Sequence, residues 1–335
     1  MHKTGSANGS FFGNFLYDRL LGGREHFLKD LARSVDFTFV RQACRGFYAD
    51  WGRDPWDPVV MFKMVCLQFL YDLSDREVEE QASFNLMFKW FLGLSAEEPA
   101  PDHTTLCRFR ARLGAEGFQT LFNRMVEQAR ERGLVSDRLH ILDATHINAK
   151  VDLFRLKKEH CRGDDDDTWA DRNSPDPDAR FGRKSKGKGF YGYKAHIVED
   201  AETELIVAVK TTPGNAADGP QLPELVDGRA GEVTADKAYD SEANHAHLAG
   251  LGVASGIIRR RPRPGRPHLS RRLRPKIERK FAEGKNRHGL ARARYWGLAK
   301  VSLQVIMVAL VTNLKRLVKL ILGGAGPPLR PAWTT

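Results

Sequence analysis

Cysteine is scarce in this sequence of 335 residues, and its spacing counts against two classes of protein. The four cysteines are scattered along the chain, and none forms a CxxC pair (Cys44, Cys66, Cys107 and Cys161). Zinc modules and secreted disulfide scaffolds need cysteines in closely spaced sets. We therefore expect neither a zinc module nor a disulfide framework.

Long uninterrupted apolar runs are also lacking. The N-terminal stretch "MHKTGSANGSFFGNF" has no charged region followed by a long apolar core, so no signal peptide is expected. The most apolar stretch, residues 301–322, is broken by Lys315, Arg316 and Lys319. This pattern predicts a packed C-terminal helix and not a membrane span. The expected location is the cytoplasm.

Acidic residues are scarce in one segment that carries all of the net positive charge. Residues 259–300 hold 16 Lys or Arg and two Glu, a net charge of +14, whereas the whole chain has +11. Such a segment favours a polyanionic partner, although a solvated basic face or a disordered tail would look similar. Phe281, Leu290, Tyr295 and Trp296 interrupt the charges and need a surface to pack on.

The N-terminal part of the chain has the pattern of several short amphipathic helices. Asp57 precedes Pro58, which predicts a helix that begins there. Ser74 stands three residues before Glu77, the spacing of a capping box. We predict an all-α domain over residues 1–135.

Strands appear in the second half of the chain. Short apolar or alternating runs predict strands at 138–149, 189–200, 203–214, 232–236 and 253–261, with helices between and after the later ones. This order predicts an α/β domain over residues 136–322, with a mixed sheet flanked by helices. Residues 323–335 are expected to form a flexible tail.

A polar insert at about residues 150–189 separates the first two predicted strands. Its Asp, Pro, Gly and Lys content predicts a long, mobile loop. The run Asp164–Asp167 inside it is a poor metal site, because consecutive side chains point in different directions.

Three acidic residues occupy positions that can converge. Asp143 is expected to end the first strand, Asp236 the fourth, and Glu278 to lie on a late helix. Ligands collect at the carboxyl edge of an α/β sheet. Carboxylates gathered there suit Mg²⁺ or Mn²⁺, and a pair of such ions about 4 Å apart can promote displacement at a phosphodiester.

Each acid also has a structural alternative. Asp143 could cap a turn, and Asp236 could bond its own backbone in "DKAYDS". Glu278 could pair with Arg274 or Lys285 on an exposed helix face. Asp218, a nearby competitor, could cap the helix that follows it.

At these residues the sequence resembles a known family. The motifs "LDATHINA", "TTPGNAADG", "TADKAYDS" and "KIERKFAEGKNRHGLARARYWG" resemble those of the DDE transposases of bacterial insertion sequences, in the group of families four and five. The resemblance implies an RNase H-like catalytic domain and a metal-binding triad of Asp143, Asp236 and Glu278. Arg274 and Lys285 match the family signature around the glutamate, whereas Arg271 stands where the family often has tyrosine.

The resemblance implies a transposase that binds the terminal inverted repeats of its element, cleaves the ends and joins the 3′-OH to target DNA. It implies two Mg²⁺ ions as cofactors, with Mn²⁺ as a substitute. The expected partner is double-stranded DNA, bound by a homodimer. No membrane association is expected, and the expected location is the nucleoid. The basic segment is expected to contact DNA phosphates. The helical domain is expected to recognise the DNA sequence, although its arginines could instead be solvated surface residues. The expected DNA-binding residues are Arg271, Arg274, Lys285, Arg292, Arg294, Arg108, Arg110 and Arg112.

Two rival functions remain open at the level of sequence. An RNase H-like nuclease would cut DNA without joining it. A domesticated DNA-binding protein would do neither, but it would have no use for three convergent acids.

Overall fold

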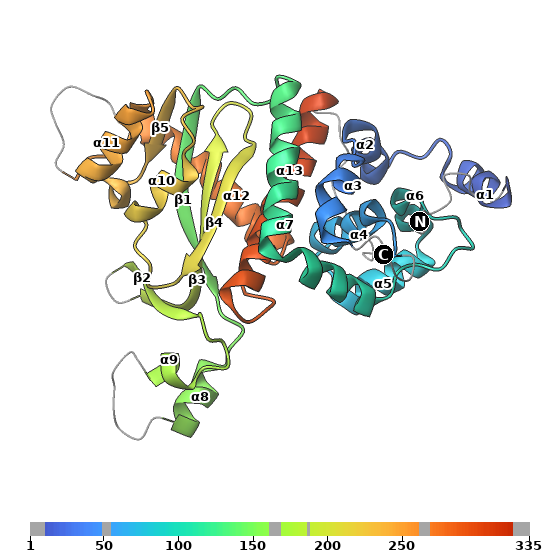
Figure 1. Ribbon diagram of the computed structural model, residues 1–335, viewed down its shortest axis with the longest axis horizontal. Coiled ribbons are helices and arrows are strands. Elements are labelled where there is room, and N and C mark those ends of the chain that lie inside the picture. Colours follow the sequence, from blue (N-terminus) through green and yellow to red (C-terminus); the bar gives the residue numbers. More distant parts are fainter. Residues whose placement is uncertain (1–10, 49–54, 161–168, 186–187, 261–268, 324–335) are drawn as a thin grey trace. The chain divides into compact units, whose positions relative to one another are not determined.

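The computed structural model describes residues 11–48, 55–160, 169–185, 188–260 and 269–323 (Figure 1). The chain divides into two compact units, the first made of Met1–Arg124 with Asn313–Thr335 and the second of Met125–Thr312. The division falls inside a helix, before the domain boundary that the sequence suggested. Most of the expected tail, 323–335, lies outside the described residues.

The first unit is helical. Its helices are α1 (Phe11–Leu21), α2 (Phe27–Ser34), α3 (Phe39–Cys44), η1 (Arg45–Phe47), α4 (Pro58–Leu70), α5 (Asp75–Phe84), α6 (Leu86–Leu92) and the first part of α7 (His103–Glu131). The predicted caps are confirmed, because Asp57 accepts a hydrogen bond from the Val59 N–H and Ser74 forms a capping box with Glu77. Gly114 is a kink within α7, with φ of 57°.

Aromatic side chains fill the core of this unit. Helix α4 is buried at almost every position, so it lies at the centre of its neighbours. Phe37 meets Phe91 edge-on with ring centroids 5.9 Å apart, and Phe62 lies 6.5 Å from Phe118. Such pairs add directional packing to the burial of apolar area.

The second unit contains a mixed six-stranded sheet. Its strands are β1 (Leu139–Asn148), β2 (Arg180–Ser185), β3 (Lys188–Asp200), β4 (Ile206–Pro213), β5 (Glu232–Ala235) and β6 (Ala254–Ser255). The order is β2-β3-β1-β5-β6, with β4 also pairing with β3. The pairs β1–β3 and β3–β4 are antiparallel, and β1–β5 and β5–β6 are parallel. This is the RNase H-like arrangement, so the predicted fold class is confirmed.

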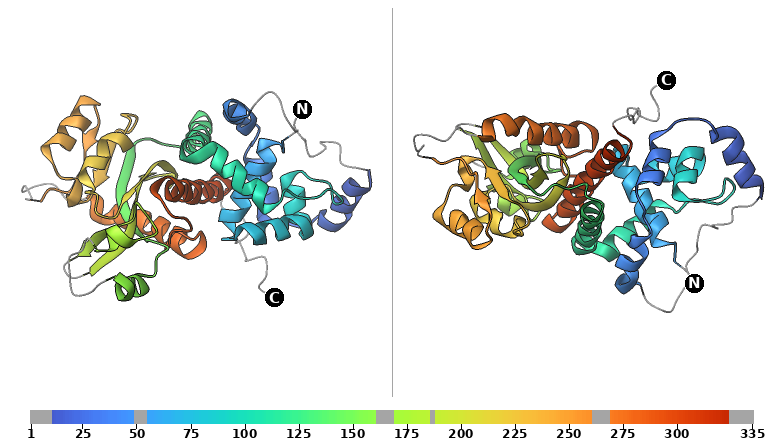
Figure 2. Two further views of the ribbon diagram at one scale, coloured as in Figure 1. Left: turned by 60° about the horizontal axis from the view of Figure 1, so that its bottom comes forward. Right: turned by 90° about the horizontal axis from the view of Figure 1, so that it is seen from above.

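Helices cover both faces of this sheet. The helices of this unit, besides the end of α7, are α8 (Leu153–His160), α9 (Trp169–Asn173), η2 (Gly219–Gln221), α10 (Leu222–Leu225), η3 (Lys237–Tyr239), α11 (Glu242–Gly250), α12 (Leu269–Arg287) and α13 (Leu298–Ile321), the last of which continues into the first unit. Figure 2 shows α12 on one face of the sheet and α11 on the other. Helix α12 packs on β1 and β5, the strands that carry or precede the two candidate aspartates.

The insert at 150–189 is not simply a loop, so this prediction was wrong. It contains α8 and α9, and β2 pairs with β3 from Arg180↔Gly192 to Ser185↔Lys188. The strand was missed because its stability comes from pairing with β3, which local composition does not reveal. The acidic run at 164–167 lies outside the described residues.

Helix α13 contains the most apolar stretch of the chain. Among the described residues it is the one helix long and apolar enough to cross a membrane, yet its most apolar part is mostly buried inside the protein. This burial fits the predicted packed C-terminal helix.

Candidate active site

The register of two parallel strands brings Asp143 and Asp236 side by side. Leu142 on β1 pairs with Ala235, the last residue of β5. The residue that follows each of them is a candidate aspartate, Asp143 within β1 and Asp236 directly after β5. Because registered residues of parallel strands lie on the same face of a sheet, the two half-buried carboxylates emerge next to each other.

Asp143 does not end its strand, as the sequence had suggested. Strand β1 continues to Asn148, and Asp143 pairs with Ile197 of β3. What ends at Leu142 is the pairing with β5, since β5 is much shorter than β1. Asp143 therefore lies where the sheet loses a strand on one side, which opens space beside its side chain.

Backbone N–H groups orient both aspartates. Asp143 Oδ1 accepts from the N–H of Ala144, and Asp236 Oδ1 accepts from the N–H of Ala238, each at 2.8 Å. The turn-capping role considered for Asp236 is thus observed for one of its oxygens. This hydrogen bond still leaves the Asp236 carboxylate able to bind other groups, because a carboxylate has about four acceptor positions.

A hollow joins the two aspartates to α12. Its lining residues are Ile141, Leu142, Asp143, Thr234, Ala235, Asp236, Ile258 and Ile277. Ile277 is fully buried, and the next residue, Glu278, is exposed. Successive residues of a helix point about 100° apart, and Glu278 is not among the residues that line the hollow.

A buried polar chain lies close to the two aspartates. The Tyr239 hydroxyl lies 3.4 Å from His196 Nδ1, and His196 Nε2 lies 2.9 Å from Thr212 Oγ1. Burial, with the charges of Asp218, Asp143 and Asp236, raises the pKa of Tyr239 well above its usual range. These three carboxylates therefore act electrostatically on the tyrosine hydroxyl.

His196 adds no positive charge to this region. Burial lowers the pKa of His196 to about 4, so the ring is neutral at physiological pH. A neutral ring accepts a hydrogen bond at one nitrogen and donates one at the other, which fits Tyr239 donating to Nδ1 and Nε2–H donating to Thr212. Sequence reasoning missed Tyr239 and His196, although Tyr239 lies in the same "TADKAYDS" motif as Asp236.

Asp218 is not a helix cap. It precedes η2 without a side-chain capping bond, and its Oδ1 instead lies 2.9 Å from Lys194 Nζ. The same ammonium group donates to the carbonyl of Ala216 at 2.8 Å. Asp218 therefore balances the charge of Lys194.

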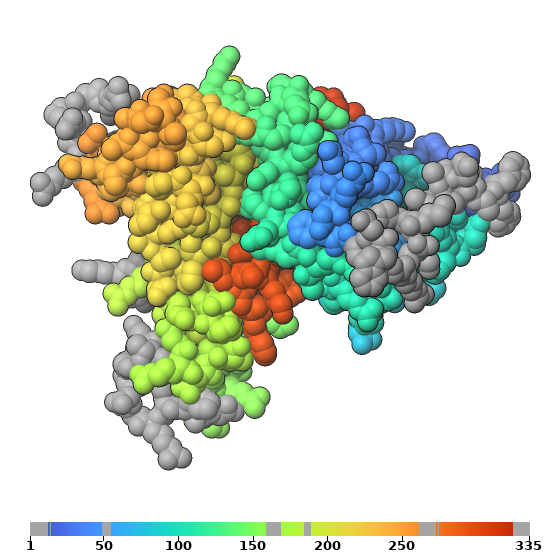
Figure 3. Space-filling view, in the orientation of Figure 1, coloured from blue at the N-terminus to red at the C-terminus, as the bar shows by residue number. Residues whose placement is uncertain are grey.

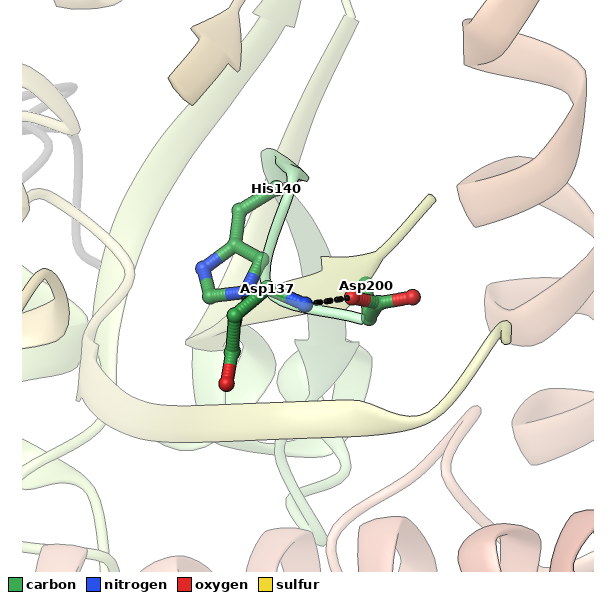
Figure 4. A group of neighbouring side chains, drawn as sticks. All are labelled: Asp137, His140 and Asp200. Carbon is green, nitrogen blue, oxygen red and sulfur yellow. Dashed lines mark hydrogen bonds and ion pairs between the residues drawn. The ribbon is translucent and has the colours of Figure 1, made fainter. Parts of the chain in front are cut away.

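A second acidic group lies near the start of β1. Asp137, His140 and Asp200 offer ligand atoms that all lie within 4.8 Å of one another (Figure 4). It is the one group of this kind among the described residues.

The atoms of this second group are engaged in structural bonds. Asp137 binds Arg130 Nε at 2.9 Å and His140 Nε2 at 2.9 Å. Asp200 accepts from the N–H groups of Asp137 and Thr203, both at 2.8 Å. The adjacent guanidinium of Arg130 would repel a metal cation. We therefore interpret this group as a set of structural hydrogen bonds that connects the start of β1 to the β3–β4 turn.

The basic segment is only partly described. Residues 261–268 and the side chains of Arg271 and Arg274 lie outside the described part, while Lys285 and Arg294 are half-buried and Arg292 is exposed. The segment is folded and not a disordered tail where described, because Phe281 and Leu290 are buried.

The three arginines of α7 have different surroundings. Arg108 and Arg112 are exposed, and Arg112 stacks on the ring of Tyr48 at 4.6 Å. Arg110 is buried, and its guanidinium binds both oxygens of Asp75, at 2.7 and 2.6 Å. The prediction that Arg110 contacts DNA is therefore wrong, because Asp75 already neutralises its charge inside the helical unit.

The Arg110 pair also explains the acidity of its partner. Burial raises the pKa of Asp75, but the hydrogen bonds and charge of Arg110, with a bond from Gln68, outweigh burial and lower the value to about 2.

Comparison with known families decides the identity of the catalytic unit. Residues 136–314 match the family described as Transposase DDE domain, which covers more than half of the chain. The chain belongs to this transposase family. Residues 15–112 match a second family, described as Transposase domain (DUF772), and these residues lie in the helical unit.

Among solved structures, the transposase is similar to a chain in the crystal structure of a pre-cleavage Mos1 transpososome. The identity is 11%, the match covers 84% of this chain and 83% of the other, and the TM-score is 0.26. Family membership makes the protein an enzyme that acts on DNA and uses divalent metal.

Proposed function

We propose that this transposase binds the terminal inverted repeats of its own element, cleaves DNA at the element ends and joins the freed 3′-OH to target DNA. Asp143, Asp236 and Glu278 are the proposed catalytic residues. The observation that carries this proposal is the Leu142↔Ala235 register, which sets two aspartates from distant parts of the sequence next to each other.

The proposed triad fits a hard divalent cation. It offers carboxylate oxygens alone, without sulfur or imidazole, and such ligands suit Mg²⁺ and Mn²⁺. Crowded carboxylates repel each other unless a cation balances them, and the neighbouring His196 is neutral. We propose two Mg²⁺ ions, with Mn²⁺ as a substitute, held by Asp143, Asp236 and Glu278.

The chemistry consists of two displacements at phosphorus. In the first, water attacks, the bond from phosphorus to the 3′ oxygen breaks, and that oxygen leaves as the 3′-OH. In the second, the 3′-OH attacks a target phosphodiester, and the target 3′ oxygen leaves. Bound ions supply an activated attacking oxygen and a stabilised leaving oxygen.

The protein's own groups orient the triad and the DNA. The N–H groups of Ala144 and Ala238 fix the two aspartate carboxylates. Lys285, Arg292 and Arg294, with Arg271 and Arg274, hold phosphates without reading sequence. Arg108 and Arg112 are the remaining candidates for contacts in the recognition of the repeat, since both are exposed.

Incubation of the purified protein with its element's end DNA and Mn²⁺ tests this function. Nucleotide resolution of the products should show both cleaved ends and joined products for the unaltered protein. Asp143→Asn and Asp236→Asn should each abolish both products while leaving DNA binding intact. Cleaved ends without joined products would support a nuclease, and an active Asp236→Asn variant would leave Asp236 with its capping role alone.

We also propose a homodimer on DNA and a nucleoid-associated location in the cytoplasm. An element has two ends, and one copy of the proposed site at each end would let both ends react together. Light scattering of the protein with end DNA should give a mass of two chains per paired complex. A mass of one chain per DNA end under cleaving conditions would contradict the dimer.

A further inference from the structure

The loop between α12 and α13 is tied to the end of β1. The N–H of Asn148 donates to the carbonyl of Ala291 at 3.1 Å, and the N–H of Ala293 donates to the carbonyl of Asn148 at 2.8 Å. These bonds form a parallel bridge between Asn148 and Arg292. We call residues 289–297 the anchored loop.

A buried glutamine of α13 holds the same loop from a second side. Gln304 is fully buried, and its Oε1 accepts from the N–H of Arg294 at 2.8 Å. Its Nε2 donates to the carbonyls of Gly289 at 2.8 Å and Arg292 at 3.0 Å. One side chain thereby fixes three points of the loop backbone.

The insert before β2 holds the end of the loop. Asp176 is fully buried, and its Oδ1 accepts from the N–H of Gly297 at 3.1 Å and from the Tyr193 hydroxyl. Asp178 Oδ2 accepts from the N–H of Leu298 at 2.7 Å, at the start of α13. Three separate elements thus fix a loop that has no regular structure of its own.

The anchored loop presents an aromatic ring outward. Leu290 and Ala293 are buried, whereas Trp296 is 50% exposed. Its Nε1–H donates to the carbonyl of Lys150 at 3.0 Å, which restricts the orientation of the indole. Figure 3 shows the segment after α12, in red, at the surface of this unit. A fixed, half-exposed indole is a preformed face for a flat ligand.

Two cationic residues accompany this ring, while the carboxylates of Asp176 and Asp178 nearby accept from backbone N–H groups. Lys150, whose carbonyl receives the indole N–H, has an exposed side chain, and so has Arg292. Exposed cations flanking an aromatic face form the combination that binds single-stranded nucleic acid, in which bases stack while phosphates are neutralised. A base inside a duplex has both faces covered by its neighbours, so only an unpaired base fits.

The anchored loop also stands in a fixed relation to the proposed active site. Asn148 follows Asp143 by five residues on one continuous strand, a separation of about 16 Å for extended chain. We propose that the anchored loop is a stacking platform for an unpaired nucleotide of the DNA end, with the base on Trp296 and the adjoining phosphates on Arg292 and Lys150. This inference rests on the proposed function, because it places the platform beside the cleavage site.

Fluorescence of 2-aminopurine tests the platform in the full-length protein. The probe is placed in turn at each unpaired position of a pre-cleaved element end with a short single-stranded overhang. Stacking on an indole should quench the probe at one or two positions. Trp296→Ala should abolish this quenching and weaken binding of the overhang DNA by about tenfold or more, while binding of a blunt duplex is unchanged. Trp296→Phe, which keeps a ring, should retain most of the quenching.

Phe154→Ala is the matched control, since Phe154 is 84% exposed on α8 of the same unit but lacks the anchored surroundings. It should leave quenching unchanged. Cleavage of blunt end DNA by the unaltered protein is measured in the same preparation, so failure of the proposed function is seen separately. Equal quenching in the unaltered and Trp296→Ala proteins would overturn the platform, as would equal losses in the Trp296→Ala and Phe154→Ala variants.

Discussion

Glu278 differs from the other two proposed catalytic residues in how it is positioned. The aspartates come from paired strands, whereas Glu278 comes from α12, which packs across those strands through the buried Ile277. If Glu278 holds metal, Glu278→Asp, which shortens the reach, and Glu278→Gln, which removes the charge, should each lower the cleavage rate by about a hundredfold or more. Single-turnover cleavage of end DNA measures this.

Glu283 provides the control on the same helix. Its carboxylate lies 3.7 Å from Nε2 of the buried His288 and so has a structural neighbour of its own. Glu283→Gln should cleave at nearly the unaltered rate. Similar rates for the Glu278 and Glu283 variants would show that Glu278 is a surface residue of α12.

Tyr239 is expected to position the aspartate site without touching substrate. Tyr239→Phe keeps the buried ring but removes the hydroxyl that meets His196, a loss of about 1 kcal/mol for one hydrogen bond. We expect about a tenfold lower cleavage rate with unchanged affinity for end DNA, because the group lies near the carboxylates and not on the DNA. A rate equal to that of the unaltered protein would leave Tyr239 with a packing role only.

At the scale of whole elements, β3 and α12 meet around a buried acid. Glu199 is fully buried, and neither carboxylate oxygen has a hydrogen-bond partner within the described part of the chain. Burial raises the pKa of Glu199 to about 7, against the opposing charges of Lys280, Lys276 and Arg279 on α12, while Glu204 adds to the rise. The folded state therefore binds a proton more tightly than the unfolded chain does.

The sign of the resulting pH effect follows from that difference. Between the ordinary glutamate pKa of about 4.5 and the raised value, the folded protein holds more protons, so stability falls as pH rises. Glu199→Gln should remove this fall, by up to about 3 kcal/mol. The difference in melting temperature between the two proteins should change between pH 5 and pH 8. A constant difference over that range would contradict the raised pKa.

Local signals predicted the elements that depend on neighbouring residues. The caps at Asp57 and Ser74 were predictable because their bonds span two or three residues, and β3 and β4 because each has an apolar or alternating pattern of its own. Strand β2 was not, although β3 follows it closely, because its sequence RFGRKS is mostly charged and lacks an alternating apolar pattern. Arg110 was misjudged because its burial depends on Asp75, a partner 35 residues away.

The candidate active site was likewise predictable only in the features that a local motif carries. Motifs identified Asp143 and Asp236 as candidates, but their adjacency depends on the pairing of β1 with β5, which chain order does not specify. The anchored loop was read from the sequence only as basic and aromatic. Its rigidity comes from Gln304 at the start of the following helix, and from Asn148 and Asp176, which are both remote from it along the chain.

For the molecule as a whole, the charge distribution predicts strongly salt-dependent DNA binding. The net +14 of residues 259–300 exceeds the +11 of the whole chain. Neutralised phosphates release counterions, so affinity falls steeply with salt. Arg292→Ala should reduce the slope of log affinity against log salt by about one. Affinity measured over a salt series tests this, and an unchanged slope would remove Arg292 from the DNA interface.

The central claim is that Asp143, Asp236 and Glu278 form one metal site. Calorimetric titration of the full-length protein with Mn²⁺ tests it without reference to activity. Asp143→Asn, Asp236→Asn and Glu278→Gln should each weaken binding by about tenfold or more, with melting temperatures close to that of the unaltered protein. Asp137→Asn, in the group held by Arg130 and His140, should bind Mn²⁺ as the unaltered protein does. Unchanged affinity in the three triad variants, or a loss confined to Asp137→Asn, would contradict the account.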